Sequence, residues 1–149
     1  MTDQPEVMRA SFVMEYAFKR SLGPVLSKFV TGLRDRKLLA SKTADGRVLM
    51  PPSEYDPKTG AEVSDLVEVA GTGEVTTWTW VAEPRPKHPH DRPFAYALVK
   101  LDGADTPFLN TVLVDGPEQM KTGMRVQVRW AEQRGTGITD IAGFVPEEG

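Results

Sequence analysis

The chain has 149 residues, 40% of them hydrophobic and 26% charged, which is enough for one core or for one core with a small appendage. No apolar run approaches the ~20 residues that cross a bilayer, no signal peptide is recognisable, and the absence of cysteine excludes disulfides, so a cytoplasmic protein is expected. Residues 1–65 carry ten Lys and Arg against nine Asp and Glu, whereas residues 66–149 carry eight against twelve. Because polynucleotide binding needs an excess of cations, the acidic larger part disfavours nucleic acid as a partner.

The first feature along the chain is an extended arm. Residues 11–19 alternate, with Phe12, Met14, Tyr16 and Phe18 on one face, which is strand periodicity without a neighbouring hairpin signal. Two interpretations stay open: the arm lies on its own domain, or its large side chains dock on another chain.

A helix is predicted at roughly residues 24–36. Gly23-Pro24 opens it, because proline is preorganised for the first helical position. Its apolar side chains recur on one face, as in a core or interface helix, at Val25, Leu26, Phe29, Val30 and Leu33.

Two tight turns follow, each ending in glycine, at residues 42–46 and 56–60. With cysteine at four positions, 42, 45, 56 and 59, they would form a tetrahedral zinc ribbon. This chain instead has Lys42, Asp45, Asp56 and Thr59 there. Because a lysine would repel a divalent metal, we expect no metal, and an ion pair of Lys42 with Asp45 or Asp56 in its place.

The remaining pattern is one of strands. Two short strands, Leu38–Ala44 and Arg47–Met50, flank the Asp45-Gly46 turn. Five more are predicted at Glu74–Ala82, Phe94–Leu101, Pro107–Val114, Met124–Trp130 and Ile138–Val145, with one helical turn near Pro117.

This pattern predicts a mostly β protein. We expect a five-stranded OB-fold barrel that is preceded by an N-terminal helix and by a degenerate, metal-free, zinc-ribbon-like hairpin. The expected division is an arm and helix at 1–36, the ribbon at 37–65 and the OB-fold at 66–149.

The segment Pro84–Pro93 is the most distinctive candidate binding element. It carries Arg85, Lys87 and Arg92, four prolines stiffen it, and Phe94 follows it, a combination that suits a phosphate-bearing nucleotide. The alternative is a solvated loop whose prolines set its path.

The histidines and two tryptophans are the other candidates. His88 and His90 lack a third metal ligand or a partner nucleophile at a recognisable spacing, so surface positions are expected. Trp78 and Trp80 share one strand face, where they either stack on a base or adenine or belong to the core.

These elements together resemble one family, the acyl-CoA-associated OB-fold proteins with an N-terminal rubredoxin-like zinc ribbon, long classed as a domain of unknown function. The resemblance covers roughly residues 20–148, and parts of it are similar to an actinobacterial branch. It is carried by the stretches Ser21–Val25, Gly46–Pro52, Trp78–Val81, Asp91–Phe94 and Leu101–Asp105. The missing cysteine quartet is the departure from the family pattern.

The resemblance implies an accessory subunit and no catalytic activity of its own. Members of the family associate with thiolase-superfamily proteins, including the lipid-transfer-protein-like aldolases of steroid side-chain breakdown, and others accompany MaoC-like enoyl-CoA hydratases. It therefore implies a thiolase-like catalytic partner, a steroid side-chain aldolase in particular, in a heterotetramer. No cofactor is expected on this chain alone, and acyl-CoA is expected at the interface.

On this hypothesis the candidate residues form two groups. Partner docking is expected at Phe12, Tyr16, Phe18, Val25, Phe29 and Leu33. Contact with CoA is expected from Arg85, Lys87, His88, Arg92, Phe94, Trp78 and Trp80. The alternatives are a partner of a MaoC-like hydratase, a stand-alone OB module for single-stranded nucleic acid, and an independent enzyme, for which no acid–base pair or nucleophile is recognisable.

Overall fold

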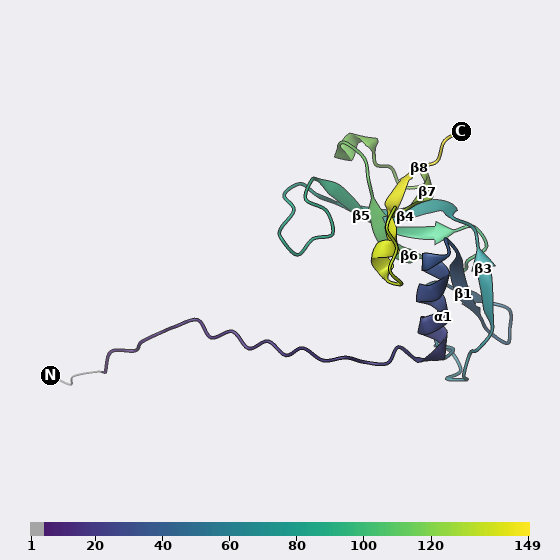
Figure 1. Ribbon diagram of the computed structural model, residues 1–149. Coiled ribbons are helices and arrows are strands. Elements are labelled where there is room, and N and C mark those ends of the chain that lie inside the picture. Colours follow the sequence, from purple (N-terminus) through teal and green to yellow (C-terminus); the bar gives the residue numbers. More distant parts are fainter. Residues whose placement is uncertain (1–4) are drawn as a thin grey trace.

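Five strands close into a barrel in the order β4-β5-β6-β8-β7 in the computed structural model, which describes residues 5–149 (Figure 1). They are β4 (Thr72–Val81), β5 (Phe94–Leu101), β6 (Phe108–Val112), β7 (Arg125–Trp130) and β8 (Ile141–Pro146). The 3-10 turns η1 (Pro117–Gln119) and η2 (Ile138–Asp140) precede β7 and β8. The predicted mostly β fold with a five-stranded barrel and an N-terminal helix is confirmed. The last strand begins later than predicted because its first three residues form η2.

Alternation along the strands fills the barrel. On β5 the inward side chains of Ala95, Ala97, Val99 and Leu101 are all 2% exposed or less. Tyr96 and its neighbours on the other face of the strand are directed outward. This is the periodicity of two that allows one face of a strand to form a core.

A second sheet packs at one end of the barrel, with strand order β2-β1-β3. Its strands are β1 (Leu38–Lys42), β2 (Val48–Leu49) and β3 (Leu66–Val69). The Asp45-Gly46 turn between the first two strands forms as expected, with Gly46 at φ 88°. The third strand was not predicted for this sheet; it pairs with β1 through Leu38 and Val69.

Helix α1 (Gly23–Arg34) ends two residues before the predicted end. The N–H of Lys37 donates to the carbonyl of Gly32 at 2.8 Å, and that of Arg36 to Leu33 at 3.0 Å. This is a Schellman ending, and it places Arg36 in the left-handed region at φ 61°.

The small sheet and the barrel share one core. Leu33, Leu38 and Met50 belong to the same buried cluster as Val99 and Phe144 of the barrel. Backbone and side-chain hydrogen bonds join the two sheets as well. The N–H of Met50 donates to Thr106 Oγ1 at 2.7 Å, and that hydroxyl donates back to the Met50 carbonyl at 2.9 Å.

The arm, residues 5–22, is extended and leaves the N-terminal end of α1, running away from the barrel (Figure 1). The first four residues of the expected 1–36 segment lie outside the described residues. None of the helices within residues 5–149 is long and apolar enough to span a membrane.

Candidate functional site

The loop between β4 and β5 is anchored on Phe94. The ring of Phe94 is 0% exposed and lies edge-on to three others, with centroid distances of 5.0 Å to His90, 5.0 Å to Tyr96 and 5.9 Å to His88. Phe94 therefore holds the loop on the barrel. The expectation that it contacts CoA is corrected, because it has no exposed surface to offer a ligand.

His90 ties the same loop to the barrel. Its Nε2 lies 2.9 Å from Thr111 Oγ1 on β6. Burial, and then the positive charge of Arg92, lower the pKa of His90, and Asp91 opposes the shift. The imidazole is therefore neutral at pH 7. It was expected at the surface, and it is half-buried instead.

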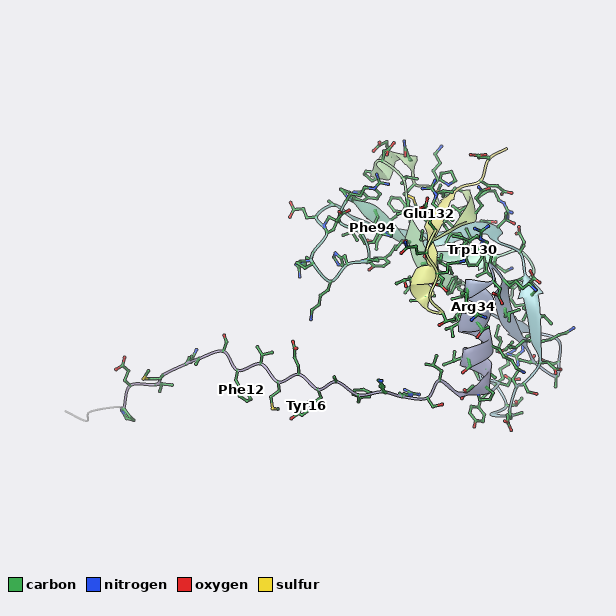
Figure 2. The ribbon with its side chains drawn as sticks, viewed as in Figure 1. Phe12, Tyr16, Arg34, Phe94, Trp130 and Glu132 are labelled. Carbon is green, nitrogen blue, oxygen red and sulfur yellow. The ribbon has the colours of Figure 1, made fainter. Side chains whose placement is uncertain are left out.

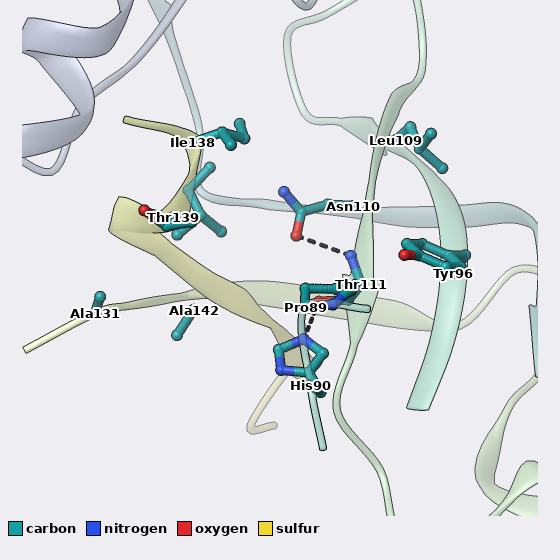
Figure 3. A pocket seen from close by; sticks show the side chains of 11 residues that line it. Pro89, His90, Tyr96, Leu109, Asn110, Thr111, Ala131, Ile138, Thr139 and Ala142 are labelled. Atoms are coloured by element: carbon teal, nitrogen blue, oxygen red, sulfur yellow. Dashed lines mark hydrogen bonds between the residues drawn. The ribbon is translucent and has the colours of Figure 1, made fainter. Parts of the chain in front are cut away.

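An open groove with a volume of about 470 Å³ runs between this loop, β6 and η2 (Figure 3). Leu109 and Ile138, at 60% and 51% exposure, stand at its edges. Outside the arm they are two of the three exposed large hydrophobic side chains in residues 23–149; the third is Tyr55. The groove is lined by Pro89, His90, Tyr96, Leu109, Asn110, Thr111, Ala131, Ile138, Thr139, Ile141 and Ala142.

This groove was not predicted from the sequence, although a signal was present. Tyr96, Leu98 and Leu109 occupy outward positions on two predicted strands, where a barrel usually carries polar residues. The register places Leu98 opposite Leu109 and Tyr96 opposite Thr111. A smaller hollow of about 190 Å³, lined in part by Trp78, Tyr96 and Leu109, adjoins the groove and extends the apolar face.

Trp78 and Trp80 are directed toward the inside of the barrel. They pair with Ala97 and Ala95, whose small inward side chains leave room for the indole rings. Both tryptophans are partly buried and pack against the core, as expected if they belong to the core and do not stack on a base. Trp78 also lines the smaller hollow, where one part of it is accessible.

The cations of the loop do not form one cluster within residues 5–149. Arg85 and Lys87 are exposed, and the backbone N–H of Arg85 donates to Nδ1 of the half-buried His88 at 2.9 Å. Arg92 lines a different hollow together with Arg129. A clamp for a phosphate is therefore not assembled by this loop alone.

The arm presents the largest accessible apolar side chains of the described chain. Phe12, Tyr16 and Phe18 are 83%, 77% and 83% exposed, and Figure 2 shows Phe12 and Tyr16 standing off the extended backbone far from the barrel. Extended segments with large apolar side chains commonly bind to the surface of another protein.

Three other docking candidates are corrected by the structure. Val25, Phe29 and Leu33 are only 6%, 6% and 0% exposed, because α1 turns its apolar face into the chain's own core. They are therefore structural residues, and no partner can reach them while α1 is packed in this way.

The four positions of the expected ribbon are only partly brought together. Asp45 and Asp56 meet at the side chain of Arg47, and not at Lys42, which is exposed and makes no ion pair within the described residues. Thr59 is exposed and accepts a hydrogen bond from a nearby backbone N–H. Residues 5–149 contain no group of three or more His, Asp or Glu side chains that could hold a metal ion.

These observations define an OB-fold barrel with an accessible apolar groove, a helix-backed small sheet and a free arm. Residues 66–131 match the protein family described as "ChsH2, C-terminal OB-fold domain". The match therefore supports an OB-fold for the barrel part of the chain.

Solved structures agree with this fold. One titled "Ltp2-ChsH2(DUF35) aldolase" superposes with a TM-score of 0.65 at 24% identity, covering 86% of this chain and 98% of that chain. A protein of unknown function from the DUF35 family of Sulfolobus solfataricus superposes with a TM-score of 0.57 at 21% identity, covering 71% of this chain and 78% of the other. Both support the fold.

One named relative is a longer protein. The "Probable enoyl-CoA hydratase alpha subunit" of Thermomonospora curvata (strain ATCC 19995) is 32% identical over 101 residues, which are 66% of this chain and 31% of that protein. This chain therefore spans about a third of the length of that relative.

Proposed function

We propose that the chain is a non-catalytic accessory subunit that binds and stabilises a thiolase-superfamily, lipid-transfer-protein-like acyl-CoA enzyme in the cytoplasm. In its most specific form the partner is a steroid side-chain aldolase and the assembly is a heterotetramer. Support comes from the likeness to an OB-fold structure whose title joins it to an aldolase, and from the family match over the barrel.

The observation that carries the proposal is the exposure of the arm. Three aromatic side chains, each more than three-quarters exposed, would be unfavourable in water on an isolated protein. The folded part of the chain offers them no contact, since the arm runs away from the barrel (Figure 1). A separate catalytic subunit that covers Phe12, Tyr16 and Phe18 would remove this surface from water.

The groove supports a second, smaller role. Its walls are mainly apolar, and the loop that carries Arg85 and Lys87 forms one of its sides through Pro89 and His90. An apolar groove beside exposed cations suits the pantetheine and phosphate parts of a CoA ester. Because the cations do not converge, the partner would have to complete this site.

Co-expression with a lipid-transfer-protein-like thiolase homologue from the same genome tests the proposal. The full chain should co-elute with the enzyme in size-exclusion chromatography and increase its soluble yield. The arm variant F12S/Y16S/F18S should lose co-elution, whereas K19S/R20S, a control on the same arm, should retain it. No co-elution of the unaltered chain with any such homologue would contradict the proposal.

A second candidate partner is a MaoC-like enoyl-CoA hydratase. It is favoured by the name of the Thermomonospora curvata relative. The same co-elution experiment with a hydratase homologue in place of the thiolase homologue distinguishes the two partners.

A further inference from the structure

The two turns of the small sheet converge on one side chain, Arg47. Its Nε donates to both carboxylate oxygens of Asp45, at 3.1 and 3.0 Å. Its Nη2 donates to both carboxylate oxygens of Asp56, at 2.7 and 2.6 Å. One guanidinium therefore joins the first turn, which holds Asp45, to the second turn, which holds Asp56, nine residues after Arg47.

The surroundings fix this network in place. The side chain of Asp56 is 6% exposed and that of Arg47 is 21% exposed. Asp56 also accepts the backbone N–H of Lys58 at 2.8 Å, which shapes the second turn. In the first turn, Thr43 Oγ1 donates to Asp45 and accepts the N–H of Arg47 at 3.0 Å.

The family resemblance implies a zinc ion held by positions 42, 45, 56 and 59, but the residues present do not fit it. Two of the four positions carry carboxylates, and both are already bound to a guanidinium. A divalent cation at the same place would be repelled by Arg47, which is always protonated. Lys42 adds a further cation at a ligand position, and a structural zinc site needs four good donors.

We propose that the Arg47 guanidinium takes the place of the metal ion in this small sheet, so that the chain keeps the crosslink between its two turns without zinc. The chemistry of the replacement is complementary: a planar cation with a fork of donors satisfies two anions, as a metal dication satisfies four thiolates. A crosslink made in this way is insensitive to chelators and to thiol oxidation.

The charges around the site agree with this assignment. Hydrogen bonds from Thr43 and then Arg47 lower the pKa of Asp45 to about 2. The hydrogen bond from Arg47, followed by that from the backbone N–H of Lys58, lowers the pKa of Asp56 as well. Both carboxylates therefore remain ionised, and bound to the arginine, throughout the neutral pH range.

The direct test combines metal analysis with substitutions of Arg47 in the full chain. Purified protein should contain no stoichiometric zinc, and EDTA should leave its Tm unchanged. R47M should lower the Tm by several degrees and speed amide exchange on the order of tenfold in residues 43–47 and 56–61. R47K should be intermediate, because an ammonium cannot make two forked pairs.

A matched control and a converse variant complete the test. R85M removes an exposed arginine with no ion pair within residues 5–149 and should change neither quantity. K42C/D45C/D56C/T59C with R47M should gain one zinc per chain, because it restores the metal donors and removes the cation. One zinc in the unaltered protein, a Tm that falls in EDTA, or an R47M variant indistinguishable from R85M would overturn the proposal.

Discussion

Arg134 is hydrogen-bonded to the end of helix α1, a hundred residues earlier in the chain. Its Nε donates to the carbonyl oxygen of Arg34 at 2.8 Å, and its Nη1 donates to the carbonyl of Ala131 at 2.8 Å. Arg34 is at the C-terminal end of α1, where the helix has unpaired carbonyls and a partial negative charge (Figure 2). The barrel therefore holds α1 through an arginine that caps it.

Replacing this arginine should loosen the helix. R134M should reduce the free energy of unfolding by about 1–2 kcal/mol, since two hydrogen bonds from a charged donor are lost. That corresponds to a Tm lower by about 3–6 °C in a chain of this size. Thermal unfolding measures it, with R129M as the control, because Arg129 is exposed and makes no ion pair in the described residues. Equal Tm values for the two variants would contradict the capping role.

Gly73 is required by the close approach of two strands. A Cβ at this position would lie 2.5 Å from the carbonyl oxygen of Lys100 and 2.9 Å from Cα of Leu101. Because both are backbone atoms of β5, they cannot move aside without disturbing the barrel. G73A should therefore destabilise the protein by about 1–3 kcal/mol in urea unfolding. G135A, where a Cβ meets nothing within 4 Å, should stay within about 0.5 kcal/mol of the unaltered chain.

Arg36 offers the opposite case, a position where glycine should be better than the native residue. It adopts φ 61° in the ending of α1, a conformation that is unfavourable for a side chain with a Cβ. R36G should stabilise the protein by about 0.5–1 kcal/mol after the greater freedom of glycine in the unfolded chain is subtracted. Urea unfolding checks this, and R34G, at the last residue of α1, should destabilise instead. A destabilised R36G would show that contacts of the arginine side chain outweigh the cost of its left-handed backbone conformation.

How far the sequence predicts this molecule depends on the range of each interaction. Local signals, such as Gly23-Pro24 at the helix start and Asp45-Gly46 in the hairpin, predict their elements correctly because short-range geometry sets them. The partner of Asp45 was predicted wrongly, as Lys42 instead of Arg47, since sequence spacing does not say which of two nearby cations points across the sheet.

The groove illustrates the same limit at longer range. Leu109 lies on β6 and Ile138 on η2, and only the closure of the barrel brings them to one surface. The apolar face of α1 is a related case. Periodicity predicts that Phe29 is buried, but whether it is buried in its own core or in a partner's is a question of tertiary packing.

Acid should weaken the barrel through Asp102. Hydrogen bonds from Arg125 and then Thr72 lower the pKa of Asp102 to about 2, from an ordinary value of 3.8. Its ionised form is therefore favoured by folding, so its contribution is complete above the unfolded pKa and is lost as the pH falls through 3.8 toward 2. The free energies of unfolding of the unaltered protein and D102N, measured in urea, should differ at pH 6, and this difference should shrink as the pH falls to 2. A gap that stays constant over this range would contradict the assignment.

The same substitution should strongly destabilise the chain at one phenylalanine and hardly affect its stability at another. Phe18 on the arm is 83% exposed, whereas Phe29 on α1 is 6% exposed and packs in the common core. F29A should cost about 3–5 kcal/mol, because it removes a buried ring and leaves a cavity, and F18A should change stability by less than about 0.5 kcal/mol. Urea unfolding of the isolated chain measures both values. Binding to a catalytic partner should respond differently from folding. F18A should weaken the complex, although the isolated subunit remains fully folded. A destabilised F18A in the isolated chain would mean that the arm packs on its own domain, which is the interpretation that the exposure of Phe18 argues against.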